Sequence, residues 1–237
     1  MQFVSPFFRR LLAIVVCTAA LLTGLVATGG GASAASVRSP KAPRSFSATI
    51  EADTAYVAQT SCDPHIKRGT AKLGAFLTKT YPDISWGSTR PCDSTTSEHY
   101  DGRAIDWMAS ARSSHQHAEA AALIKWILAT DRFGHRFAMA RRLGVMYLIF
   151  NSRMWGAWDG KWQEYNGCLH GKLRQHKYDN DCHRTHVHIS LSWNGARAKT
   201  SFWTGHLSRT DFGPCKRKGH KYAPKWTHVN LTGCPGQ

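Results

Sequence analysis

The side chains best suited to chemistry lie in two short segments, residues 97–106 and 182–190. In the second segment, His186 and His188 are two residues apart, and alternate side chains of a strand share a face. Both imidazoles would then project together, while their neighbours turn into apolar surroundings. This pattern is typical of one edge of a metal site.

The first segment supplies two more ligands of the kind that zinc prefers. His99 comes seven residues before Asp106, and Gly102 between them lets the backbone turn. This histidine and this aspartate, with one histidine of the second segment, make three N/O ligands. Catalytic zinc sites use three protein ligands and keep a fourth position for water, so we expect a catalytic Zn²⁺ site.

The first segment also resembles a family motif. Ser97, His99, Gly102, Ala104 and Asp106 match every fixed position of S-x-H-x-x-G-x-A-x-D. This is the first zinc motif of the D-Ala-D-Ala metallopeptidases. Their superfamily also includes lysostaphin-type endopeptidases, penicillin-insensitive murein endopeptidase and the Hedgehog signalling domain, and the sequence looks like a secreted actinobacterial branch of it.

The second motif of the superfamily, H-x-H, is similar to residues 186–188. The resemblance implies zinc on His99, Asp106 and His188, with His186 as a catalytic residue beside the reacting centre. It also implies a Hedgehog-like or D,D-peptidase-like domain. The implied activity is hydrolysis of amide bonds in peptidoglycan peptides.

One position departs from the carboxypeptidase branch, which places an acidic base three residues before the last ligand. Thr185 stands there in this sequence. The arrangement His183-x-x-His186-x-His188 resembles penicillin-insensitive murein endopeptidase instead, whose site uses histidines in place of that carboxylate. We therefore expect an endopeptidase in which His183 orients or assists His186, with Asp181 as an alternative proton acceptor.

Other residues near the motif have simpler interpretations. Ser97 and Arg90 are candidates for binding a peptide carboxylate, since arginine offers a bidentate fork. We expect Glu98 and Asp101 to be solvated turn residues. Three tryptophans near an Asp-Gly turn indicate core and hairpin packing, with a substrate platform as the alternative; they are Trp155, Trp158 and Trp162.

The positioning elements follow from local patterns. Helices are predicted for residues 69–81, for residues after a cap at Ser113 or Ser114, and for residues 136–143. Strands are predicted for residues 103–108, 145–150 and 186–193, with a hairpin at 158–162. This mixture lacks a βαβ rhythm and indicates an α+β fold, with a small antiparallel sheet flanked by helices.

The ends of the chain indicate export. Residues 1–34 have a basic start, an apolar run and a small-x-small cleavage pattern, so we expect a cleaved signal peptide and no stable membrane anchor. The six remaining cysteines predict disulfides, which in the simplest pairing join sequence neighbours. They are Cys62–Cys92, Cys168–Cys182 and Cys215–Cys234. We expect a flexible leader (35–55), a zinc peptidase-like domain (56–203) and a basic, disulfide-held extension (204–237).

Charge and composition narrow the function further. Hydrophobic residues make up 42% of the chain, which excludes general disorder, and the formal net charge of +16 indicates an anionic partner. For an exported protein we expect anionic cell-wall polymers rather than nucleic acid, and a monomer at the cell wall. A secreted metal-dependent nuclease and a non-catalytic zinc-containing wall-binding module remain the alternatives.

Overall fold

The computed structural model describes residues 36–225 and 228–234, and the predicted signal peptide lies outside these residues. The chain forms an α+β domain around a six-stranded antiparallel sheet, which confirms the predicted class. The strand order is β1-β2-β6-β3-β4-β5. The strands are β1 (Trp86–Gly87), β2 (Ala104–Trp107), β3 (Val145–Phe150), β4 (Arg153–Gly156), β5 (Lys161–Glu164) and β6 (Val187–Leu191).

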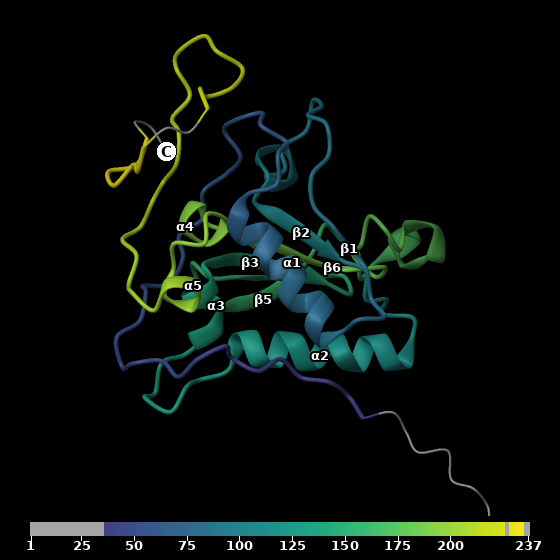
Figure 1. The fold of residues 1–237 in the computed structure, drawn as a ribbon. Coiled ribbons are helices and arrows are strands. Elements are labelled where there is room, and N and C mark those ends of the chain that lie inside the picture. Colours follow the sequence, from purple (N-terminus) through teal and green to yellow (C-terminus); the bar gives the residue numbers. More distant parts are fainter. Residues whose placement is uncertain (1–35, 226–227, 235–237) are drawn as a thin grey trace, which may run out of the picture. The chain divides into compact units, whose positions relative to one another are not determined.

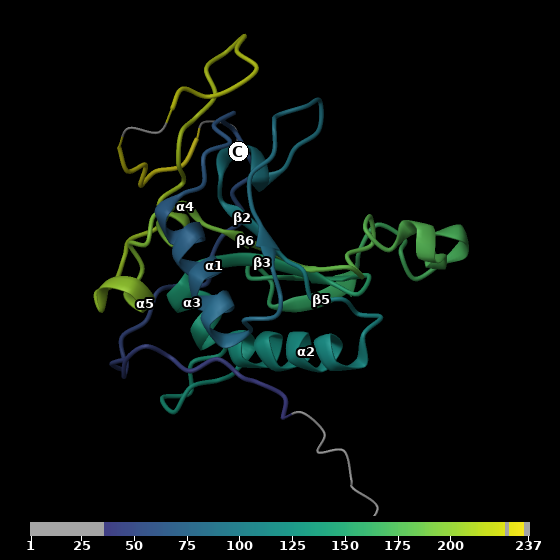
Figure 2. The same cartoon turned by 45° about the vertical axis from the view of Figure 1, so that its right-hand side comes forward.

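Helices α1 and α2 lie against this sheet (Figures 1 and 2). The helices of the described residues are α1 (Arg68–Thr80), α2 (Ser114–Leu128), α3 (Ala138–Leu143), α4 (Trp193–Ala196) and α5 (Ser201–Thr204). Three short 3₁₀ turns accompany them: η1 (Glu98–Asp101), η2 (Gly171–Arg174) and η3 (His176–Tyr178). The two turns η2 and η3 belong to a segment that projects beyond the end of the sheet (Figure 2).

Local signals account for the ends of the predicted helices. The Ser113 side chain accepts a hydrogen bond from the Gln116 backbone N–H and so caps α2, as expected. Helix α3 ends at Gly144, whose φ of 73° is the left-handed conformation that glycine adopts without strain. A side chain at position 144 would also collide with Gly195, so this glycine lets α4 approach closely.

The sheet has two different faces. Side chains of α1 and α2 pack on one face together with alternate residues of the central strands, including Ile105, Leu148 and Ile189. The opposite face carries the residues between them, such as Asp106, Tyr147 and His188. The central strands β2, β6 and β3 thus place polar side chains on the face away from the main core.

All three predicted disulfides are present: Cys62–Cys92, Cys168–Cys182 and Cys215–Cys234. The first fixes the segment before α1 to the loop that precedes η1. The second closes the projecting segment that leads into β6. The third lies in the basic C-terminal part of the chain.

Residues 36–55, the predicted leader, contain no helix or strand, but several of them contact the domain. The Arg38 guanidinium forms ion pairs with Asp83 and with the buried Glu119. The carboxylate of Glu51 accepts hydrogen bonds from the backbone N–H and hydroxyl of Ser201. These contacts fasten both ends of the leader segment to the domain.

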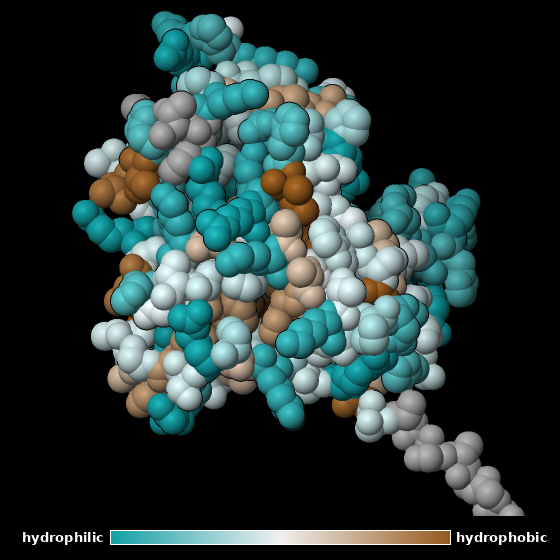
Figure 3. Space-filling view, in the orientation of Figure 1, coloured by the Kyte–Doolittle hydropathy of each residue, from teal (hydrophilic) through white to brown (hydrophobic). Residues whose placement is uncertain are grey.

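The surface is mainly hydrophilic on the side drawn in Figure 3, where hydrophobic residues occur singly or in small groups. Among the described residues, no helix has the length and apolar character needed to cross a membrane.

Candidate metal centre

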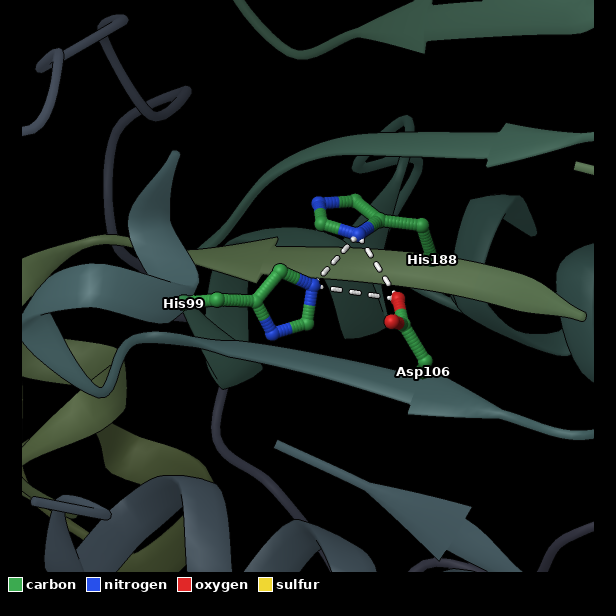
Figure 4. Close-up of side chains that lie close together, drawn as sticks. All are labelled: His99, Asp106 and His188. Carbon is green, nitrogen blue, oxygen red and sulfur yellow. Dashed lines mark hydrogen bonds and ion pairs between the residues drawn. The ribbon is translucent and has the colours of Figure 1, made fainter. Parts of the chain in front are cut away.

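Three side chains from three elements converge on the polar face of the sheet (Figure 4). Asp106 lies on β2 and is paired with His188 on the neighbouring strand β6, while His99 comes from the turn η1. His99 Nε2 lies 3.2 Å from Asp106 Oδ1 and 3.2 Å from His188 Nδ1, and His188 Nδ1 lies 2.9 Å from Asp106 Oδ1. The structure thus brings the three predicted ligands together.

The spacing of these atoms suits a metal ion. Zinc bonds to nitrogen and oxygen are about 2.0–2.1 Å long, so two ligand atoms of a tetrahedral site lie about 3.3 Å apart. The three distances between the converging atoms are close to this value. His99, Asp106 and His188 are one of two groups among the described residues that could hold a metal ion.

Hydrogen bonds of the outer nitrogens orient both imidazoles. His99 Nδ1 donates to the backbone carbonyl of Ser88, because a carbonyl only accepts, and the neutral ring then presents a lone pair at Nε2. His188 Nε2 lies 2.8 Å from the hydroxyl of Ser190. Ligating histidines commonly have such partners on the outer nitrogen, where they fix the ring and its tautomer.

Behind His188, the polar contacts continue to a buried carboxylate. The hydroxyls of Ser190 and Tyr147 both donate to Glu98 Oε2, the former at 3.4 Å. Glu98 is only 2% exposed, so the prediction that it is a solvated turn residue was wrong. Burial and the neighbouring carboxylate raise the pKa of Tyr147 well above its usual value, which keeps this hydroxyl a donor.

The prediction for Asp101 was wrong as well. Its carboxylate is fully buried and forms a bidentate ion pair with Arg103 at 3.0 and 3.1 Å. The guanidinium of Arg103 also donates to the carbonyls of Val57 and Leu191. This pair ties the turn η1, and with it His99, to β6 and to the segment before α1.

His186 lies beside the three converging atoms. Its Nε2 is 3.5 Å from Asp106 Oδ1, and its Nδ1 is 2.9 Å from the hydroxyl of Thr185. Burial lowers the pKa of His186, so its ring is neutral at pH 7. A neutral imidazole at this place can accept a proton at Nε2.

His183 stands behind this ring rather than among the converging atoms. Its ring centroid is 4.7 Å from that of His186 and 5.6 Å from that of His188. Burial, and then the nearby imidazoles, lower the pKa of His183 to about 2. Its φ of 50° is a left-handed conformation for a non-glycine residue, in the loop that the Cys168–Cys182 disulfide closes.

Burial also shapes the electrostatics of the converging ligands. It lowers the pKa of His99 and so favours the neutral form of this ring. Burial alone would raise the pKa of Asp106, but the contacts with His188 and His99 outweigh it and hold this pKa well below its usual range. The site thus places an ionised carboxylate beside imidazole nitrogens, and this donor set binds divalent cations.

The remaining predicted residues line the same cleft, which measures about 390 Å³ and includes Arg90, Ser97, Asp181 and His186. Arg90 is 53% exposed and its guanidinium lies 3.5 Å from Asp106 Oδ2. The Ser97 hydroxyl accepts a hydrogen bond from the His99 backbone N–H and so caps η1. Asp181 is exposed at the rim.

Sequence reasoning missed the supporting residues behind the ligands. Ser190 could have been found, because it follows His188 at the strand period and must share its face. Tyr147 and Glu98 could not, since they are 49 residues apart and meet only where the turn η1 lies against β3. The Ser88 carbonyl carries no signal in the side-chain pattern.

Of three comparisons with known proteins, the one against family models finds a match. No curated protein and no solved structure matches the chain. A family model described as VldE, C-terminal domain, matches residues 62–178, just under half of the chain. The matched region contains His99 and Asp106 and ends before the strand that carries His188. The chain is thus similar to this family over the part that supplies two of the three converging side chains.

Proposed function

We propose that the protein is a secreted zinc-dependent peptidase that hydrolyses amide bonds in peptidoglycan stem peptides or cross-links, as an endopeptidase rather than a carboxypeptidase. The observation that carries the proposal is the convergence of His99 Nε2, Asp106 Oδ1 and His188 Nδ1 at the wall of a cleft that Asp106 and His188 line. The resemblance of residues 97–106 and 186–188 to the D-Ala-D-Ala metallopeptidase motifs supports the same activity and a Hedgehog-like or D,D-peptidase-like arrangement.

A zinc ion held by these three side chains would polarise the scissile carbonyl and lower the pKa of a water molecule toward 7. The chain itself supplies the proton carrier. His186 Nε2 faces the cleft, takes the proton of the attacking water and delivers it to the leaving amine nitrogen. The Thr185 hydroxyl at Nδ1 holds this ring in place.

His183 acts on His186 rather than on the substrate. Its ring packs against that of His186 and remains neutral, so it limits rotation of the catalytic ring without adding charge. The exposed Asp181 is the alternative proton acceptor, because it lines the same cleft. Arg90 and Ser97 bind a carboxylate of the peptide, and Arg90 is the only arginine among the side chains that line this cleft in the described residues.

The proposed location is the cell wall. The three disulfides are typical of proteins outside the cytoplasm. The net charge of +16, which becomes +14 when a cleaved signal peptide removes Arg9 and Arg10, favours attraction to anionic wall polymers, and added salt would weaken this attraction. Neither a nucleic-acid partner nor a stable membrane anchor is part of the proposal, and the protein is proposed to act as a monomer.

The test is digestion of purified peptidoglycan by the zinc-loaded protein, with mass spectrometry of the released fragments. Fragments that carry a new amine and a new carboxylate at one peptide bond support the proposal, and the bond identifies the enzyme as an endopeptidase or a carboxypeptidase. His186→Ala should bind zinc and release no fragments above background. His206→Ala is the matched control, since this histidine is exposed and lies outside the cleft.

A further inference from the structure

A second pocket of about 400 Å³ opens beside the metal cleft and is lined by Tyr56, Tyr147, Ile149, Met154, Trp158 and Tyr165. Its volume lies in the range of small-molecule binding sites. Tyr147, Ile149 and Tyr165 line both the pocket and the cleft. A substrate could therefore occupy both spaces at once.

The pocket is an aromatic corner with two rings open to solvent. Tyr56 is 50% exposed and Trp158 is 41% exposed. Their ring centroids are 5.4 Å apart and their planes meet at 66°, so the two faces point in different directions. Trp155 is buried in the core, as predicted, whereas Trp158 packs on the hairpin and keeps enough of its ring exposed for a ligand to reach it.

Strand β4 carries a glycine at the position where the Trp158 indole lies against it. Gly156 on β4 is the cross-strand partner of Tyr147, and the Trp158 indole lies over it. A Cβ atom at position 156 would come within 2.5 Å of the indole ring. Glycine here lets the Trp158 indole approach the strand, where it meets Tyr147 edge-to-face with 6.4 Å between the ring centroids and 69° between the planes.

Tyr147 connects the pocket with the metal centre. Its ring stacks on that of His188 at 5.4 Å and 16°, while its hydroxyl is held by Glu98. A group bound against Trp158 is therefore two ring contacts away from a proposed zinc ligand. Two such contacts, of 6.4 and 5.4 Å, span at most about three or four residues of an extended substrate.

The chemistry of the lining selects the type of group. None of the six side chains is charged, which disfavours the charged residues of a stem peptide, and an alanine methyl would leave most of the volume empty. A pyranose ring is neutral, presents C–H groups to the negative faces of aromatic rings, and carries hydroxyls that can bond to the tyrosine hydroxyls.

From these observations we infer that the Tyr56–Trp158 pocket is a sugar-binding subsite that holds a glycan ring next to the hydrolysed peptide. This inference rests on the proposed function for its substrate, but the pocket itself can be tested without hydrolysis. If the pocket holds a sugar, the preferred substrate is a peptide still attached to its glycan, and the hydrolysed peptide bond lies close to that sugar.

The binding test uses the N-acetylglucosamine tetrasaccharide and metal-free protein, followed by calorimetric titration. Wild type should bind the sugar saturably, and Trp158→Ala and Tyr56→Ala should each weaken binding at least about tenfold. Trp162→Ala is the matched control, because this tryptophan is 39% exposed on the next strand and does not line the pocket. Gly156→Ala tests the same platform without removing a ring, and should also weaken binding.

The outcomes separate the two proposals. Two results would overturn the subsite. The first is equal binding by wild type and by folded Trp158→Ala or Gly156→Ala. The second is no binding by wild type at a sugar concentration of about 10 millimolar, which is on the order of the weakest specific affinities. Sugar binding that these variants lose, in a protein that releases no peptide fragments, supports the subsite and removes the peptidase proposal. In an active enzyme, Trp158→Ala should lower kcat/KM for glycan-bearing peptides relative to glycan-free ones, and an unchanged ratio contradicts the inference.

Discussion

The Nε2 atom of His99 lies 3.2 Å from the Nδ1 atom of His188, with Asp106 Oδ1 within 3.2 Å of both. The outer nitrogen of His99 donates to a carbonyl, so its inner nitrogen carries a lone pair. Two nitrogens and a carboxylate oxygen this close together are arranged as the ligands of one metal ion would be. A metal ligand must offer a free lone pair, so metal binding at this place is expected to weaken as the pH falls.

We predict that the protein binds one zinc ion and that this binding depends on His188. His188→Ala should lower zinc affinity at least about a hundredfold, since it removes one of three ligands. Competition with a chromophoric chelator measures the affinity, and elemental analysis measures the stoichiometry. His206→Ala should bind like wild type. One zinc ion bound equally tightly by His188→Ala would place the metal elsewhere.

Ser190→Ala is predicted to weaken zinc binding by about 10–100-fold without touching a ligand, because the outer nitrogen of His188 loses its partner. The exposed Ser45 provides the control substitution, Ser45→Ala. The same chelator competition is the readout. An affinity equal to that of the control variant would show that the serine does not orient the histidine.

Tyr147→Phe should lower the free energy of unfolding by about 1–3 kcal/mol, because the buried Glu98 loses a hydrogen-bond donor. Urea unfolding of the metal-free protein measures the change. Tyr222→Phe, whose hydroxyl bonds a backbone carbonyl near the surface, should change stability by much less. Equal effects of the two substitutions would contradict the buried network.

The pH dependence of stability tests the burial of His183. Its pKa is about 2 in the folded protein and about 6.5 when unfolded, so only the unfolded chain gains this proton as pH falls below 6.5. The folded state is then destabilised by up to about 1.4 kcal/mol per pH unit, while nothing is lost above pH 6.5. His183→Asn, which tolerates the left-handed backbone, should flatten this slope in chelator-treated protein. An unchanged slope would mean that His183 titrates normally.

Two of the disulfides allow a comparison of their effects on stability and zinc affinity within one molecule. Replacing Cys168 and Cys182 by alanine should cost about 3 kcal/mol of stability and lower zinc affinity, because the closed loop leads into β6. Replacing Cys215 and Cys234 should leave zinc affinity unchanged, since neither residue lines the cleft. Unfolding curves and chelator competition on both double variants separate the two effects. Equal zinc affinities would show that the first disulfide does not position the site.

Much of the fold could be predicted from local patterns. The run of apolar residues bounded by Gly144 and Asn151 gives strand β3 with the predicted bounds, and the alternation after Thr185 gives β6. Capping by Ser113 and the pairing of neighbouring cysteines followed from equally local rules. For the same reason, the strand period placed His186 and His188 on one face.

What the sequence did not reveal depends on contacts between distant segments. The acidic groups Glu98 and Asp101 look like surface residues in a turn. The hydrogen bond from Tyr147 and the ion pair with Arg103 offset the free-energy cost of burying these carboxylates. The two-residue strand β1 is too short to leave a periodic signal. The pocket around Trp158 likewise forms only where Tyr56 and Tyr147 meet it in space.

The central claim is that His99, Asp106 and His188 form the zinc centre of a peptidase that acts on peptidoglycan. The most direct measurement is the mass spectrum of fragments released from purified peptidoglycan by zinc-loaded wild type and by His186→Ala with zinc still bound. The account predicts peptide-bond products from wild type and none from the variant. Equal product release by both proteins would remove His186 from the mechanism. Cleavage of DNA without any release of peptide fragments would contradict the peptidase itself.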